Sequence, residues 1–371
     1  MRVKRRSGRS RSEAPPAWAV LAVGLVITLG VGLPSPGLDL SPGAALPADR
    51  VLDLGPSLLE LGLKPILGVL VLIELAKLAA PRWIESVAGK AEPASMPLPS
   101  IVGLAALGVA TVEAARYYRA LDEIEALSGG GLAALAGIAS LVAGTALLIW
   151  LADRIRLPGL DRSGLWVVYA LMAVGIVPYD LWNAIDAARA GMVPPWAIGA
   201  VLLAAVVAIV AIVFMRLTML RALVRSGVDP LVWSPVLLWP PVVAAWIVGT
   251  LVVWLERAAV FDGASVFRSD LALVTTLATT VLTPAILLLY ARAIAQRAPG
   301  AARWRGRRVI LALLALLQTA LCLAALGFWA TEPFATQGPE LIVVAIVAHT
   351  LWLEWRSRAA GESAIGRLRG R

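Results

Sequence analysis

Ten predominantly apolar stretches run along the chain, and short polar or charged segments separate them. The stretches cover residues 17–33, 57–79, 100–118, 132–152, 164–184, 195–215, 233–255, 270–293, 308–330 and 339–353. An α-helix satisfies its own backbone hydrogen bonds, and about 20 apolar residues carry it across a bilayer. The pattern therefore predicts an all-α polytopic membrane protein with ten transmembrane helices.

The composition excludes a soluble enzyme. Of the 371 residues, 60% are hydrophobic and only 15% are charged, and the mean hydropathy is +0.83. Soluble domains contain about 45–50% apolar and about 25% charged residues. One globular core cannot bury such an excess, so the bilayer is the solvent that fits this chain.

The basic residues predict how the chain is oriented. With the N-terminus inside, 26 of the 33 Lys and Arg residues fall in the inner segments 1–16, 77–99, 152–163, 216–232, 291–308 and 354–371. Cytoplasmic loops of membrane proteins are rich in Lys and Arg, so both termini are predicted to be cytoplasmic. The basic start resembles a signal peptide, but no small-residue cleavage pattern follows the first stretch, and a retained first span is expected.

Little in the sequence favours catalysis. Cys322 is the single cysteine and His349 the single histidine, so neither an internal disulfide nor a Cys/His metal cluster can form. No convergent acid pair and no phosphate-binding loop of the GxxxxGK[ST] type is found. No catalytic residue, metal or cofactor is therefore expected, and His349 is interpreted as an interfacial polar residue.

Five local patterns resemble the SecY family, the central channel of the protein-translocation machinery, and they occur in the family's order. The most specific one is Ala143–Ile155 followed by Gly159, which shares with the family a Gly-Thr pair, a Trp, an acid, an Ile and a turn Gly. The others are Gly32–Asp39, Leu59–Leu75, Asp229–Pro240 and Gly338–Val344.

This resemblance implies two five-helix inverted pseudo-repeats around a central pore. The implied parts are an N-terminal half at 17–190, a C-terminal half at 191–355, and basic cytoplasmic tails at 1–16 and 356–371. Pro65 and Pro240 interrupt the second span of each half. Such paired breaks favour a functional centre between repeats, although prolines are also common in membrane helices.

By position, the resemblance further implies a pore ring, a lateral gate and a plug. The ring positions are Leu63, Leu67, Val168, Trp239, Val243 and either Leu341 or Ile342. All are apolar, as a constriction that closes by dewetting requires. The gate residues are Glu74 and Ser234, and Glu74 is also spaced to pair with Lys77 as a structural anchor. Segment 40–56 occupies the plug position and is short.

Partners implied by the resemblance would supply the energy and the substrates. They are a SecE-like small membrane subunit, with a SecG-like one as an option, SecA or a ribosome on the cytoplasmic side, and secretory or membrane polypeptides. The candidate docking cluster comprises Arg297, Arg303, Arg305, Arg307 and Arg308. These arginines would equally serve positive-inside topology and contact with anionic lipid. The family's long docking loop is reduced here to about 216–232.

Three functions stay open. The first is a SecY-like protein-conducting channel subunit of a bacterial-type inner membrane. The second is a degenerate or specialised paralogue, favoured by the short loop, the short plug and Lys64 beside the ring. The third is a secondary transporter built on inverted repeats, with Lys64 and Glu74 at its midplane site. Glu60, four residues before Lys64, would instead neutralise it within one helix.

Overall fold

The computed structural model describes residues 17–36, 57–59, 61–79, 100–123, 127, 130–157, 160–261, 268–297, 300, 303–304, 306–329 and 338–359. Helices make up nearly all of this part of the chain. They are α1 (Ala17–Gly32), α2 (Lys64–Ala79), α4 (Ser100–Glu123), α5 (Gly130–Arg154), α6 (Ser163–Arg189), α7 (Pro195–Arg225), α8 (Pro230–Phe261), α9 (Arg268–Arg297), α10 (Arg307–Trp329) and α11 (Gly338–Ala359). The prediction of an all-α protein is confirmed.

Each apolar stretch overlaps one of these helices over most of its length, but several helix ends differ from the prediction. Helix α2 begins only at Lys64, because Pro65 lacks the amide hydrogen that a longer helix would need there. Helix α7 continues to Arg225, and α8 begins at Pro230. The predicted loop 216–232 is therefore reduced to the connection 226–229, in which Gly227 adopts a φ of 69°.

Seven of the described helices are long and apolar enough to cross a membrane, namely α4, α5 and α7 to α11. The apolar parts of α1 and α6, Ala19–Val31 and Ser163–Gly175, are shorter. The protein is thus a multi-pass membrane protein, and ten spans stay a prediction.

The helix contacts repeat between two groups. In the first helix group (α1, α2, α4, α5 and α6), the packed pairs are α4 with α5, α2 with α4, α5 with α6, α1 with α6, and α2 with α5. In the second helix group (α7 to α11), the pairs at the same places in the order are α9 with α10, α8 with α9, α10 with α11, α7 with α11, and α8 with α10. Every pair of the first group thus has its counterpart in the second.

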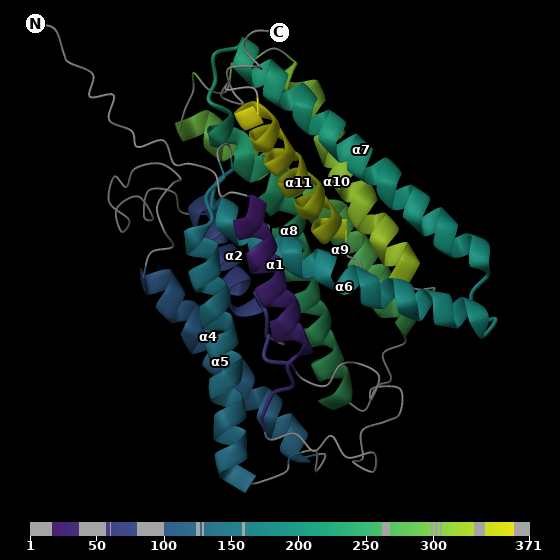
Figure 1. Cartoon of the computed structure of the whole chain (residues 1–371). Helices are drawn as coiled ribbons and strands as arrows, with labels where there is room; N and C mark the ends of the chain where they lie inside the picture. Colours follow the sequence, from purple (N-terminus) through teal and green to yellow (C-terminus); the bar gives the residue numbers. More distant parts are fainter. Residues whose placement is uncertain are drawn as a thin grey trace, which may run out of the picture.

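The core lies where the two groups meet, around α6, α8 and α11. In the apolar segments of α8 and α11 that are long enough to cross a membrane, 56% of the residues are buried. In the corresponding segment of α7, 11% are buried. Figure 1 shows α7 on one side of the molecule and α4 and α5 on the other. The groups contact each other through α6 with α11 and α7, and through α2 with α8 and α9.

Hydrogen bonds between polar groups fix the chain directly after α1. Ser35 Oγ lies 2.7 Å from the Tyr118 hydroxyl, which donates to the Pro36 carbonyl at 2.8 Å. Pro34 and Ser57 form an isolated antiparallel bridge. The two ends of the segment between them are therefore held together, while the predicted plug, 40–56, lies outside the described residues.

Candidate functional site

The buried carboxylate of Glu74 on α2 is the centre of a polar cluster. It is 4% exposed. Lys77 Nζ donates to Oε1 at 2.7 Å, and the Tyr290 hydroxyl of α9 donates to Oε2 at 3.2 Å. Arg162 Nη2 lies 3.8 Å from Oε1. The predicted pairing of Glu74 with Lys77 is confirmed, and the same carboxylate also contacts the second helix group.

The turn before α6 supplies the rest of this cluster. Arg162 adopts a left-handed conformation, with φ 49° and ψ 41°, which few residues other than glycine hold without support from their surroundings. Its guanidinium lies over the Trp239 ring, 6.0 Å from the centroid. The neighbouring Asp161 amide donates to Ser234 Oγ on α8 at 3.2 Å. The turn therefore contacts α2 and α8 at once.

The polar cluster, made up of Glu74, Lys77, Asp161, Arg162, Ser234 and Tyr290, contains two acids and two bases. Its formal charges cancel, which suits a site largely removed from water. Glu74 and Tyr290 join α2 to α9, and Asp161 and Ser234 join the start of α6 to α8. The polar cluster therefore connects the two helix groups.

Asp161 gives this cluster a pH dependence. Burial raises the pKa of its carboxyl above the usual 3.8, and the Arg162 guanidinium only partly opposes this effect. The folded chain thus binds this proton more tightly than the unfolded chain. The stability contribution is complete below pH 3.8 and is lost as the pH rises through the raised folded pKa. As the pH rises from 3.8 through the folded pKa, the Asp161→Asn variant should become more stable relative to the unmodified protein. Thermal unfolding in detergent at a series of pH values measures this difference.

The control for this experiment is Asp186→Asn. The Asp186 side chain is half exposed and pairs with Arg189 on the surface of α6. Because exposed pairs contribute little to stability, Asp186→Asn should change the stability only slightly. Parallel pH profiles for Asp161→Asn and the unmodified protein would contradict the assignment.

Both predicted gate residues, Glu74 and Ser234, lie in the polar cluster, although no hydrogen bond joins them directly. The sequence interpretation missed Asp161, Arg162 and Tyr290. The adjacent acid and base at 161–162, two residues after the turn glycine at 159, are the available signal for two of them. Nothing in the pattern around Tyr290 indicates that it faces an acid more than 200 residues earlier.

Most of the predicted ring residues lie in one apolar core. Those exposed by at most 8% are Leu63, Leu67, Val168, Trp239, Val243 and Ile342. Of the two alternatives on α11, Ile342 is buried in this core, whereas Leu341 is only half-buried. Trp239 packs edge to face on Trp166, with ring centroids 4.9 Å apart. The predicted ring residues, Leu341 apart, are therefore buried in the same core.

The two predicted breaks, Pro65 and Pro240, are also buried, in the first turn of α2 and in the middle of α8. The candidate docking arginines are less uniform. Arg303 and Arg308 are exposed, while the side chain of Arg297 and all of Arg305 lie outside the described part of the chain. Arg307 is half-buried, donates to the Ala291 carbonyl at 3.2 Å, and lies over the Trp233 ring at 5.4 Å. It therefore also contributes to packing.

Lys64 and His349 differ in exposure: Lys64 is exposed and His349 is buried. Lys64 is exposed at the start of α2, where its charge interacts with Glu113 of α4; Glu60 lies outside the described residues. His349 is 6% exposed and its Nδ1 lies 3.0 Å from Arg216 Nη1, whereas its place at a membrane interface stays a prediction. Pairing between α7 and α11, which sequence spacing does not reveal, buries His349.

Among the described residues, no group of three His, Cys, Asp or Glu side chains is placed to hold a metal.

No protein-family model and no curated protein matches the chain. Solved structures of similar fold do. One is SecY, in a structure concerned with its plug domain and the closed state of the translocation channel; it has a TM-score of 0.52, 14% identity and 92% coverage of both chains. Others are Sec61 in the canine ribosome–channel complex from the endoplasmic reticulum (TM-score 0.51, 16% identity) and a protein-conducting channel (TM-score 0.51, 14% identity), each also with 92% coverage of both chains. The chain is therefore a multi-pass membrane protein with the fold of the SecY and Sec61 translocation channels.

Proposed function

We propose that this protein is a protein-conducting channel subunit through which signal-bearing polypeptides cross or enter a membrane. The observation that carries the proposal is the burial of the predicted ring residues in one core between the two helix groups. Bulky apolar side chains exclude water and ions from such a constriction until a chain separates them. Leu63, Leu67, Val168, Trp239, Val243 and Ile342 would form the ring in its closed state.

The lateral gate in this proposal lies between α2 and α8. These helices are in contact, and each also packs on α9. The polar cluster links them near one end, because the turn before α6 contacts Glu74 of α2 through Arg162 and Ser234 of α8 through the Asp161 amide. An apolar signal segment would leave the ring for lipid by separating α2 from α8, and the polar cluster would oppose that separation.

The two halves, 17–190 and 191–355, would move relative to each other during this opening. The repeated contact pattern of the two helix groups supports this division. We place the protein in a bacterial-type inner membrane, with a SecE-like and optionally a SecG-like subunit beside it. SecA or a ribosome would approach the exposed Arg303 and Arg308. Sec61 in a ribosome–channel complex has the same fold, which supports a partner of this kind.

Crosslinking tests the proposal directly. A photo-reactive residue at Leu67, buried in the core, should crosslink to an arrested secretory chain. The matched control is Leu72, five residues later on the same helix and 56% exposed, which should not. Equal crosslinking at both positions, or none at Leu67, would contradict the channel.

One observation favours a specialised paralogue as the second candidate. The connection between α7 and α8 has only residues 226–229 and offers little for a motor or a ribosome to bind. Purification with a SecE-like protein but without crosslinks at Leu67 would select it. A transporter is less well supported: Lys64 is exposed and Glu74 is paired with Lys77, and their ten-residue spacing places them about 15 Å apart along α2.

A further inference from the structure

Two adjacent prolines interrupt the hydrogen-bond ladder of α8 in its buried middle part. Pro240 and Pro241 lie inside the helix. In a regular α-helix, their amide hydrogens would bond to the carbonyls of residues 236 and 237, four positions earlier. Proline has no amide hydrogen, so the carbonyls of Val236 and Leu237 lose these partners within one turn. A helix is easily bent where such consecutive bonds are missing.

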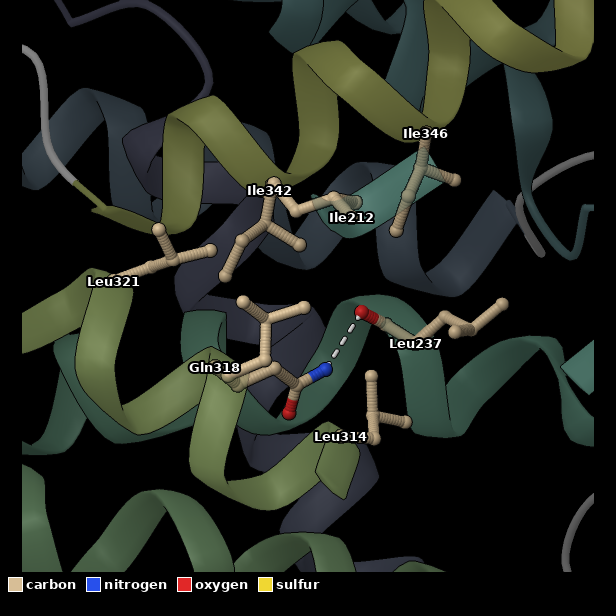
Figure 2. A pocket seen from close by; sticks show the side chains of 8 residues that line it. Ile212, Leu237, Leu314, Gln318, Leu321, Ile342 and Ile346 are labelled. Atoms are coloured by element: carbon tan, nitrogen blue, oxygen red, sulfur yellow. Dashed lines mark hydrogen bonds between the residues drawn. The ribbon is translucent and has the colours of Figure 1, made fainter. Parts of the chain in front are cut away.

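A glutamine from a neighbouring helix supplies the missing donors. Gln318 on α10 is 2% exposed. Its Nε2 donates to the Val236 carbonyl at 3.3 Å and to the Leu237 carbonyl at 3.0 Å. The bond to Leu237 is drawn in Figure 2, where the amide points from α10 towards the α8 backbone. One side chain thus satisfies the two carbonyls that the proline pair leaves free.

The contact between Gln318 and α8 lies close in sequence to two of the proposed ring residues on that helix. Trp239 comes directly before the proline pair and Val243 two residues after it, and both are buried in the core. Gln318 also lines a cavity of about 10 Å³, together with Leu237, Leu314 and the ring candidate Ile342 (Figure 2). A change in the bend of α8 at this point would therefore move two ring residues and open space beside a third.

We propose that Gln318 is a positioning residue, whose amide restrains the hinge at Pro240 and Pro241 and so holds the two parts of α8 in the closed arrangement. This inference rests on the proposed function for the meaning of "closed", but the restraint of the hinge is a property of the helix itself. In water a backbone carbonyl that loses its partner can be rehydrated. Inside this core it cannot, so the Gln318 contact favours one bend angle strongly.

The hinge angle can be measured within α8 alone. Spin labels at Val232 and Leu251, 38% and 40% exposed, lie on opposite sides of the proline pair. Their nineteen-residue spacing corresponds to about 28 Å along a straight helix, which suits pulsed electron–electron distance measurement. The buried Cys322 is first replaced by alanine, so that only the two introduced cysteines carry labels.

Gln318→Met keeps the volume of the side chain and removes its donors. We expect the population outside the main distance peak to rise about fivefold or more, the ratio that corresponds to losing a buried hydrogen bond. In the background Pro240→Ala with Pro241→Ala, helix amides return to the Val236 and Leu237 carbonyls. There, Gln318→Met should change the population less than about twofold. Leu314→Ala, which removes packing beside the same cavity but keeps the amide, is the matched control and should leave the main peak in place.

An unchanged distance distribution in Gln318→Met would overturn the inference, as would an equal broadening with and without the two prolines. Should Gln318→Met not purify, Gln318→Asn, one methylene shorter, serves in the same comparison with the same expected result. Crosslinking of an arrested secretory chain at Leu67 is measured separately. Loss of the hinge restraint in a protein that shows no such crosslink would reject the proposed channel and leave the role of Gln318 standing.

Discussion

Glu74→Ala is expected to destabilise the protein by about 3–5 kcal/mol, the range for removing one partner of a buried ion pair. The substitution leaves the Lys77 ammonium and the Arg162 guanidinium without the carboxylate they share, and the Tyr290 hydroxyl without its acceptor. It also removes the hydrogen bond that joins α2 to α9. Thermal unfolding in detergent measures the loss, and an increased ion leak in bilayers would report weaker closure between α2 and α8.

The chain provides a matched control for this variant in a second acid–base pair with the same spacing. Asp186 and Arg189 lie 3.2 Å apart on α6, with side chains 50% and 68% exposed. Since exposed pairs contribute at most about 1 kcal/mol, Asp186→Ala should have a small effect. Similar losses in the two variants would show that the polar cluster is not a specific link between the helix groups.

The second large effect is expected from Trp239→Ala. Trp239 is 1% exposed, packs on Trp166, and lies beneath the Arg162 guanidinium. Truncating a large buried aromatic side chain costs about 3–5 kcal/mol, because the neighbours fill the cavity only in part. Water can also enter an enlarged constriction more easily, so ion conductance in planar bilayers should rise in the absence of any substrate.

Two further variants separate the ring from general packing. Trp239→Phe keeps an aromatic ring in place and should leave the bilayer closely sealed. Trp196→Ala removes a tryptophan that is 74% exposed at the start of α7, and its effect on stability should stay within about 0.5 kcal/mol. A Trp239→Ala protein that unfolds more easily but leaks no more than the unmodified protein would place Trp239 outside the constriction.

The predictability of the fold follows from the length of its apolar stretches. A stretch of chain inside a bilayer must satisfy its own backbone hydrogen bonds. A long apolar stretch in the sequence is therefore enough to predict a helix there. The ends depend on other interactions. Helix α7 extends to Arg225 with a buried Arg216, which donates to the Ile346 carbonyl and contacts His349 of α11. If Arg216 is interpreted from the sequence alone, as a basic residue at the end of a span, the helix is predicted to end too early.

The candidate site was predictable only one helix at a time. Glu74 and Lys77 are neighbours on one helix face, so their spacing indicated the pair. Tyr290 and Asp161 come from other parts of the chain, and no local pattern relates them to Glu74 or to Ser234. Apolar residues occupy most positions of every span, so the ring candidates came from resemblance and not from their own chemistry.

The sequence by itself determined that this is an all-helical membrane protein, because hydropathy and helical hydrogen bonding are local properties of each stretch. It also determined where α8 is interrupted, because a proline lacks its donor in every environment. Only the tertiary structure decided which groups compensate for these features. Gln318 reaches the freed carbonyls, and Arg162 and Tyr290 reach Glu74, because packing brings distant helices within hydrogen-bond distance in a core that water does not enter.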